Sequence, residues 1–436
     1  MADVLPFRGL RYNHTLIKDL SRVICPPYDI IPPALHEELL QRDEHNFIRI
    51  EDAISQPQDN QNDNKYTRAA AVLQQWLKNC VLQSEKQPAI YIDDHYFTLL
   101  GKRQMRRGII ARVRLEEWDK GIIKPHENVI AVHVSDRVNV LRQVKVNTSP
   151  VLAMYQDKQR SLARLLEQQV SLPPVMDIVL PEGDQHIIRA VTDPTVVQQI
   201  TRYFADQALY VADGHHRYTS ALTYRRERIS ASGAIPNDPF NFVMMTLVDF
   251  EDPGLVILAP HRALCNLPQS MLNGFEEKLK TYFDLTRLPL NKPGVWNEVD
   301  KLQADRKFLR LACLTKDSDS VLILTLREPE KLGETMPYFK NLLYRKLDVS
   351  IVDNIILERV LGLGSGFSDE TKISYLYDRQ DTIDRVKKGE YQVAFFLKPI
   401  NPELIKEVSD AGAKMPRKST YFYPKAPAGL VVNPLY

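Results

Sequence analysis

The sequence predicts an α/β (or α+β) fold, and three observations support this. Strand-like and helix-like hydrophobic patterns alternate through the last third of the chain. A short apolar strand over 207–212 runs directly into a helical segment that begins near His215. The composition, 44% hydrophobic and 26% charged, is typical of a globular protein with a buried core. At roughly 100–200 residues per domain, a chain of 436 residues indicates two or three packed units.

The first 65 residues are rich in Pro, Asn, Asp and Gln. Proline removes backbone donors, so we expect this region to wrap over other elements instead of forming a regular sheet. The polar stretch 52–64 predicts a mobile loop, and the pattern that follows predicts an amphipathic helix over 66–82.

Further elements follow from hydrophobic periodicity and from turn and cap residues. The cation-rich stretch 102–107 is interpreted as a solvated hairpin, and a helix over 137–144 is expected to be capped near Asp136. Strands are expected over 89–93, 96–100, 108–115, 207–212, 241–250, 321–326, 373–375 and 391–398. The other expected helices cover 215–228, 349–361, 382–388 and 402–411, the last with Asn401 as its N-cap and Pro402 in its first position.

Charge and cysteine content exclude several classes of protein. Lys plus Arg (57) nearly balances Asp plus Glu (55), so no overall field favours nucleic acid or an acidic membrane surface. The four cysteines lie far apart without a CxxC pair, which fits reduced thiols in a cytoplasmic protein. Neither a signal-peptide pattern nor an apolar run of about 18–20 residues is found, so we expect no export and no membrane span.

The strongest candidate site is the sequence Asp-Gly-His-His-Arg at 213–217, where a predicted strand turns into a predicted helix. The first turn of a helix has unpaired N–H groups and attracts anions. Gly214 lets the backbone approach a ligand, Arg217 can donate two hydrogen bonds to a phosphate, and His215 or His216 can add a donor. Asp213 can hold Mg²⁺ or orient a hydroxyl. The alternative is a tight turn whose histidines only cap and pack.

A second candidate is the loop 121–128, in which Glu127 follows Lys124, a proline and His126. A glutamate in a rigid, proline-containing loop beside a histidine can serve as a general base toward a hydroxyl. The alternative is an ordinary solvated loop. The segment 25–29 could line a ligand cleft, but a structural wrap explains it equally well. The two cations and two hydroxyls of 415–420 could contact a phosphate, but a solvated loop explains them better. No HExxH, Walker A or GxGxxG motif is present.

Over about 5–435 the chain resembles the DUF1015 family of bacterial and archaeal proteins. The segments that carry this resemblance include Pro-Phe-Arg-Gly at 6–9, Cys-Pro-Pro-Tyr-Asp at 25–29, Val-Ala-Asp-Gly-His-His-Arg-Tyr at 211–218 and Met-Pro-Arg-Lys-Ser-Thr at 415–420. The 213–217 motif is also similar to the nucleotide phosphate loop of the ParB/sulfiredoxin-like superfamily. Its free-serine kinases pair such a loop with an upstream Lys-Pro-His-Glu segment, here 124–127.

This resemblance implies roles for named residues. Glu127 would be the base, Asp213 would lie near the metal or substrate, and His215, His216 and Arg217 would bind the phosphates, with Gly214 beside them. Lys124, His126 and Arg137 are candidate substrate or accessory residues. We expect an N-terminal wrapping region over 1–98, a ParB-like catalytic domain over 99–262 with an insertion over 151–200, and a C-terminal α/β domain over 263–436.

The function these patterns favour is Mg²⁺-dependent transfer of phosphate from ATP or ADP to a small hydroxyl compound. Free L-serine, giving O-phosphoserine, is the leading acceptor. Two other functions stay open, namely a nucleotide-gated switch that binds without transfer and a phosphate-ester hydrolase in which Glu127 activates water. A homo-oligomer is compatible with the sequence, whereas a nucleic-acid partner is not expected.

Overall fold

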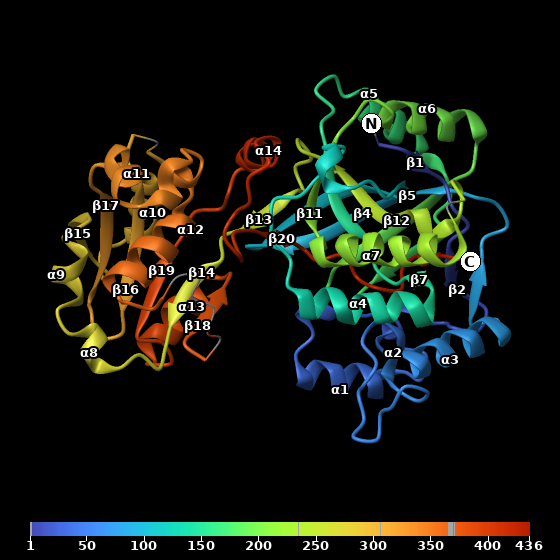
Figure 1. Cartoon of the computed structure of the whole chain (residues 1–436), viewed down its shortest axis with the longest axis horizontal. Helices are drawn as coiled ribbons and strands as arrows, with labels where there is room; N and C mark the ends of the chain where they lie inside the picture. Colours follow the sequence, from blue (N-terminus) through green and yellow to red (C-terminus); the bar gives the residue numbers. More distant parts are fainter. Residues whose placement is uncertain (1, 234, 306, 365–368, 370) are drawn as a thin grey trace. The chain divides into compact units, whose positions relative to one another are not determined.

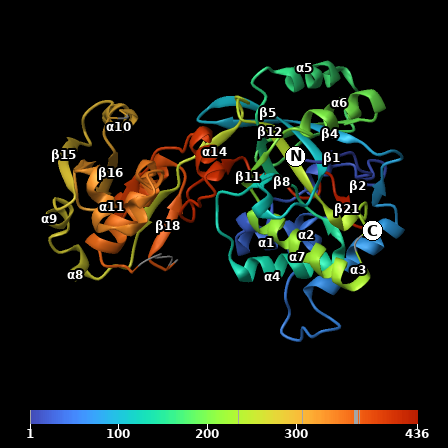
Figure 2. The same ribbon diagram turned by 45° about the horizontal axis from the view of Figure 1, so that its top comes forward.

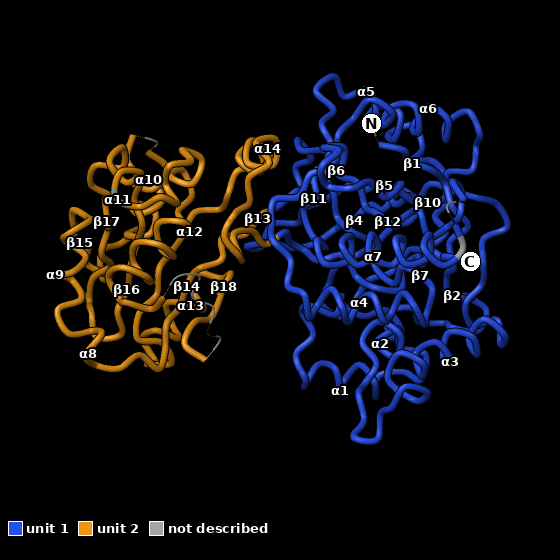
Figure 3. Tube along the Cα trace, viewed as in Figure 1, with its two compact units in different colours: residues 1–256, 422–436 blue, residues 257–421 orange. Residues whose placement is uncertain are grey.

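The computed structural model describes residues 2–233, 235–305, 307–364, 369 and 371–436. The chain forms two compact units (Figure 3). The first comprises Met1–Val256 together with Phe422–Tyr436, and the second comprises Ile257–Tyr421. The expected α/β class is therefore confirmed, with strands and helices mixed in each unit.

The first unit is built on a nine-stranded sheet in the order β6-β11-β8-β12-β5-β4-β10-β9, with β1 also paired to β5. Its strands are β1 (Val4–Leu5), β4 (Ile90–Leu99), β5 (Lys102–Arg114), β6 (Ile123–Lys124), β8 (Val151–Tyr155), β9 (Met176–Val179), β10 (Gln185–Val191), β11 (Leu209–Asp213) and β12 (Phe242–Asp249). The short pairs β2 (Leu10–Tyr12) with β3 (Leu82–Ser84) and β7 (Val146–Asn147) with β21 (Asn433–Pro434) lie outside it. A further short pair joins β13 (Val256–Leu258) to β20 (Tyr421–Tyr423).

Helices cover this sheet on both sides. They are α1 (Pro33–Arg42), α2 (Ile48–Glu51), α3 (Lys65–Lys78), α4 (Ala131–Val144), α5 (Ser161–Glu167), α6 (Pro194–Phe204) and α7 (His215–Ser232). In Figures 1 and 2, α5 and α6 lie on the opposite side of the unit from α1–α4. Two buried clusters accompany these layers: one gathers the N-terminal region around Phe47 and Trp76, and the other joins the central strands to α6 and α7 through Phe204 and Tyr218.

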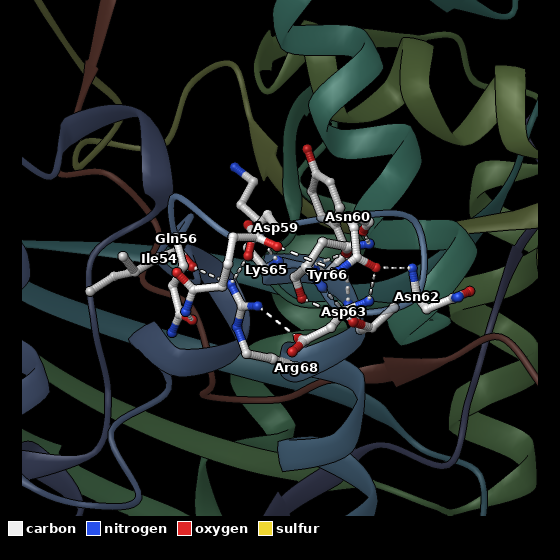
Figure 4. Close-up of polar contacts among 12 residues, drawn as sticks. Ile54, Gln56, Asp59, Asn60, Asn62, Asp63, Lys65, Tyr66 and Arg68 are labelled. Carbon is white, nitrogen blue, oxygen red and sulfur yellow. Dashed lines mark hydrogen bonds and ion pairs between the residues drawn. The ribbon is translucent and has the colours of Figure 1, made fainter.

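The polar segment expected as a loop stays outside helices and strands, and its side chains form a local hydrogen-bonded network (Figure 4). Asp59 and Asp63 both form ion pairs with Arg68 of α3. Asn64 accepts hydrogen bonds from the backbone N–H groups of Tyr66 and Thr67 and so caps α3. The network fastens the loop to the start of the helix that was expected there.

The second unit contains a six-stranded sheet in the order β15-β17-β16-β19-β14-β18. Its strands are β14 (His261–Leu264), β15 (Phe283–Pro289), β16 (Arg310–Thr315), β17 (Ser320–Leu326), β18 (Ile373–Leu376) and β19 (Val393–Phe396). Its helices are α8 (Gln269–Leu272), α9 (Phe275–Leu279), α10 (Val295–Ala304), α11 (Leu332–Thr335), α12 (Asp348–Ile351), α13 (Arg379–Lys387) and α14 (Pro402–Asp410). A π-helix, Val352–Val360, continues α12 where one α-helix was expected. Asn401 caps α14 as expected, by accepting from the N–H of Glu403.

The division of the chain differs from the expected one in three places. The expected boundary between 98 and 99 falls at the end of β4, which pairs along its length with β5, so 1–98 and 99–262 do not separate. The segment 151–200, expected as an insertion, is not set apart from the rest of the unit, since its first strand, β8, lies between β11 and β12 inside the main sheet. The C-terminal segment 422–436 belongs to the first unit, not to the C-terminal domain.

Some local expectations were confirmed and others were wrong. The hairpin expected at 102–107 is present, since these residues pair with β4 across the turn at 100–101; Lys102 and Arg103 are exposed, whereas Arg106 is buried. The two strands expected over 89–100 are one continuous strand. Arg137 and Asp136 lie inside α4, which begins at Ala131, so neither caps it. The N-terminal region, which was not expected to form a regular sheet, contains helices α1 and α2 and the short strands β1 and β2. Helix α1 starts at a proline because proline fits the first turn, where no intrahelical N–H bond is made.

Candidate functional site

The site begins where β11 ends and α7 starts. Gly214 is the residue between them, with φ +88°, a left-handed conformation that favours glycine. A Cβ at this position would also lie 3.0 Å from Arg217 Nε, so the guanidinium of Arg217 folds back against the Gly214 backbone. A register shift in the pairing with β8 falls between Val211 and Asp213. The turn and the shift together set the direction in which the Asp213 side chain leaves the sheet.

The first turn of α7 leaves backbone donors unused within the helix. No side chain caps the helix at Gly214, and the first intrahelical bond runs from the N–H of Tyr218 to the Gly214 carbonyl. The N–H groups of His215, His216 and Arg217 therefore have no carbonyl one turn earlier in α7. The helix dipole adds partial positive charge at the same place.

Arg217 is tied to three neighbours. Its Nη2 donates to Asp213 Oδ2 at 2.8 Å, and its Nη1 donates to Ser149 Oγ at 3.0 Å and to the carbonyl of Pro150. Arginine has five N–H donors in a planar fork. These contacts use both hydrogens of Nη1 and one hydrogen of Nη2. The Nε hydrogen and the second Nη2 hydrogen can still donate to a ligand.

Lys425 reaches the site from the C-terminal segment. Its ammonium forms ion pairs with Asp213 and, at 3.5 Å, with Asp29. Burial alone would raise the pKa of the Asp213 carboxyl, but Lys425 and Arg217 outweigh it and hold that pKa well below its ordinary value. Burial would likewise lower the pKa of Lys425, whereas Asp213 and Asp29 raise it above its ordinary value. Asp213 and Lys425 are therefore both charged near neutral pH.

The loop that carries Glu127 runs alongside β11 and the start of α7, with a constant difference in residue number between contacting residues. Lys124 of β6 is the parallel partner of Tyr210, and the N–H of Ile130 donates to His216 Nε2 at 3.0 Å; both pairs are 86 positions apart. Glu127 and Asp213 are separated by the same number (213 − 127 = 86). Glu127 lies three residues beyond Lys124, and Asp213 lies three residues beyond Tyr210 (127 − 124 and 213 − 210), in the same direction because the two strands are parallel.

Three histidines fasten this loop to the helix start. His126 Nδ1 donates to the Val211 carbonyl at 2.9 Å, and the His126 N–H donates to His215 Nε2 at 3.3 Å. His215 and His216 both accept from backbone N–H groups of the loop, so each has its proton on Nδ1. His126 Nε2 lies 4.0 Å from the carboxylate of Glu127, which is a quarter exposed.

The accessory candidates occupy different positions. The Lys124 ammonium lies 5.4 Å from the ring centroid of Tyr210. Arg137 is buried: Nη1 donates to the Glu51 carbonyl at 2.7 Å, Nε donates to Asp136, and the guanidinium lies 4.0 Å from the Tyr28 ring centroid. Arg137 and Arg217 line one small cavity from two helices.

Four residues at the site were not predicted from the sequence: Asp29, Glu51, Ser149 and Lys425. Asp29 belongs to the segment 25–29, which was considered as a possible cleft lining, and Lys425 lies five positions after the resemblance segment 415–420. These residues lie far from Asp213 in the sequence, Lys425 by 212 positions, and no local sequence pattern predicts such a contact. Within the second unit, the backbone carbonyls of Arg417 and Lys418 accept hydrogen bonds from the buried Arg262.

The described residues show neither a metal-binding cluster nor a membrane-spanning helix. No group of three or more His, Cys, Asp and Glu side chains is placed to hold a metal ion. Among the same residues, no helix has the length and apolar character needed to cross a bilayer.

Solved structures similar to this chain include a conserved hypothetical protein from Pyrococcus furiosus (13% identity, TM-score 0.33, covering 74% of this chain and 94% of that one). They also include a free serine kinase in complex with AMP (13%, 0.34, 73% and 90%) and SbnI with a C-terminal truncation from Staphylococcus aureus (11%, 0.34, 72% and 84%). No curated protein matches the sequence. Residues 4–350 match the family described as "Protein of unknown function (DUF1015)". The chain belongs to this family.

Proposed function

We propose that this protein binds the phosphates of ATP or ADP at the start of α7 and transfers a phosphoryl group to a small hydroxyl compound. The observation that carries the proposal is the convergence of Arg217 and Lys425 on Asp213, at the N-terminus of helix α7. Catalysis of phosphoryl transfer depends mostly on positioning and on neutralising charge, and this arrangement supplies both.

In the proposed complex the phosphates lie against the first turn of α7. The N–H groups of this turn and the remaining donors of Arg217 would bind their oxygens, and Lys425 would add a positive charge. His215 and His216 accept hydrogen bonds from the neighbouring loop, so we assign them to holding that loop in place. Gly214 permits the close approach, since any side chain there would meet Arg217.

Glu127 is the proposed general base. Its register beside Asp213 and its partial exposure suit a carboxylate that receives a proton from a bound hydroxyl. The hydroxyl oxygen forms a bond to phosphorus as the bond from phosphorus to the leaving phosphate oxygen breaks. Glu127 takes the hydroxyl proton, and the nucleotide leaves with one phosphate fewer. His126, whose Nδ1 donates to the Val211 carbonyl, would attract this carboxylate when its Nε2 is protonated as well.

Mg²⁺ would supply charge neutralisation on the phosphate oxygens. Asp213, the expected metal ligand, has Oδ2 bonded to Arg217 and Oδ1 paired with Lys425, so its carboxylate fits poorly as a sole protein ligand. Mg²⁺ is commonly held by one or two carboxylates together with substrate phosphates. We therefore assign the ion mainly to the nucleotide and assign Asp213 to holding Arg217 and Lys425 in place.

Free L-serine remains the leading acceptor. This choice rests on the resemblance of the paired segments 124–127 and 213–217 to those of free-serine kinases. The test is incubation of the protein with Mg²⁺, L-serine and either ATP or ADP, followed by phosphorus NMR. O-phosphoserine supports the proposal. Inorganic phosphate alone would indicate a hydrolase, and an unchanged nucleotide that nonetheless binds would indicate the switch.

A further inference from the structure

Glu51 is a buried carboxylate that the proposed chemistry does not use. It is the last residue of α2 and is 1% exposed. Its Oε1 accepts from the N–H of Tyr28 at 3.3 Å and from Ser149 Oγ at 3.2 Å. Its Oε2 is buried and has no hydrogen-bond partner among the described residues. Burial raises the pKa of this carboxyl above its ordinary value, although Arg137, the Thr148 hydroxyl and Arg217 act in the opposite direction.

Burying the Glu51 carboxylate has a desolvation cost, which its interactions with Arg137 and Arg217 offset in part. A carboxylate taken out of water with one oxygen unsatisfied costs free energy, and an apolar side chain of similar size would avoid that cost. The small cavity beside it has Arg137 and Arg217 among its lining residues, together with the hydroxyl-bearing Thr148, Ser149 and Ser220. The carboxylate therefore faces two cations in a region of low dielectric constant, where charge interactions are strong.

A hydrogen-bonded chain joins Glu51 to Arg217. Arg217 Nη1 donates to Ser149 Oγ at 3.0 Å. A guanidinium can only donate and a serine hydroxyl has one hydrogen, so that hydrogen is available for Glu51 Oε1. The order of donation is thus Arg217 to Ser149 to Glu51. A carboxylate at the end of this chain strengthens the serine oxygen as an acceptor.

We propose that Glu51 is a positioning residue that acts through Ser149 to hold the Arg217 guanidinium in the orientation that binds phosphate. This rests on the proposed function, since it assigns Arg217 to the phosphates. It predicts a specific defect: loss of the Glu51 charge should weaken binding of a ligand with phosphates and leave a ligand without them unaffected.

The experiment is calorimetric titration of the full chain with ADP and with adenosine. The variants are Glu51→Gln, Ser149→Ala, the double variant, and the matched control Glu38→Gln, which changes a carboxylate on the exposed face of α1. Glu51→Gln should lower ADP affinity on the order of tenfold, the size of one hydrogen bond to a charged group. Adenosine affinity should not change, and the effect of Glu51→Gln should be much smaller when Ser149 is already alanine.

Equal losses for ADP and adenosine would overturn the proposal, because they would indicate a general loosening of the fold. So would an ADP affinity unchanged by Glu51→Gln. If Glu51→Gln does not fold, Ser149→Ala carries the same comparison of ADP with adenosine. A wild-type protein that binds ADP no better than adenosine would contradict the phosphate site itself, and with it the role of Glu51. If the wild type prefers ADP and both single variants show the same preference in size, only the role of Glu51 is contradicted.

Discussion

Lys425 forms an ion pair with Asp213, although 212 positions separate them in the sequence. Both belong to the first unit, and the whole second unit, Ile257–Tyr421, lies between them in the chain. The segment that follows the second unit therefore completes the electrostatics of a site that begins on β11. A truncation before residue 422 would remove a charged group from the site.

Replacing Lys425 with methionine should weaken ADP binding on the order of tenfold, because a buried positive charge beside the phosphates is lost. Calorimetry measures this directly. Lys158→Met, which changes an exposed lysine of the same unit, is the control and should bind as the wild type does. Equal affinity for Lys425→Met and the control would remove Lys425 from the phosphate site.

Replacing Asp213 with asparagine should destabilise the protein in a pH-dependent way. The pKa of Asp213 is lower in the folded chain than its ordinary value of about 3.9. The stabilisation from its ionised form is thus fully present above that value and is lost as the pH falls toward the folded-state pKa. Urea unfolding should show a deficit on the order of 3 kcal/mol at pH 7 that shrinks by pH 3. A deficit of the same size at both pH values would contradict the ion-pair assignment.

Arg217→Lys should retain the charge and lose the fork of donors. Lysine cannot reproduce the contacts to Ser149, Pro150 and Asp213 together with a phosphate. We expect ADP affinity to fall on the order of tenfold or more, with a smaller loss of stability than in Arg217→Ala. Calorimetry and thermal unfolding of both variants check this. Wild-type affinity in Arg217→Lys would show that a point charge suffices.

Arg106 should act on the site through the backbone before Lys425. Its guanidinium donates to the carbonyls of Tyr423 (3.4 Å) and Pro424 (3.0 Å) and to His95 Nδ1 (3.2 Å). Burial, with His186 and Arg106 nearby, lowers the pKa of His95 to about 2, so this ring stays neutral and accepts. Arg106→Met should cost about 1–3 kcal/mol of stability and weaken ADP binding. Arg103→Met, on an exposed part of the same strand, should do neither.

The elements around the site could be predicted because their signals are local. The apolar run of β11, the glycine turn and the amphipathic α7 follow one another within the sequence, and the strand, turn and helix form there. The loop with Glu127 was expected near Asp213 only by resemblance, and the parallel pairing of β6 with β11 gives the physical reason for their proximity.

The rest of the site depends on contacts that sequence patterns do not encode. Glu51 ends a four-residue helix with no distinctive motif, and Lys425 follows a whole inserted unit. Arg137 was expected near a helix cap, but α4 starts six residues earlier, and the side chain is buried against Tyr28. Only the assembled fold brings these groups to Arg217.

The most direct test of the central claim is Glu127→Gln, assayed for both turnover and ADP binding. Glutamine keeps the size and most hydrogen bonds but cannot take a proton, and Glu117→Gln is the control ten positions earlier. If Glu127 is the base, turnover with ATP or ADP and L-serine should fall on the order of 10²–10⁴ while ADP affinity stays within about twofold. Wild-type turnover in Glu127→Gln would contradict the account.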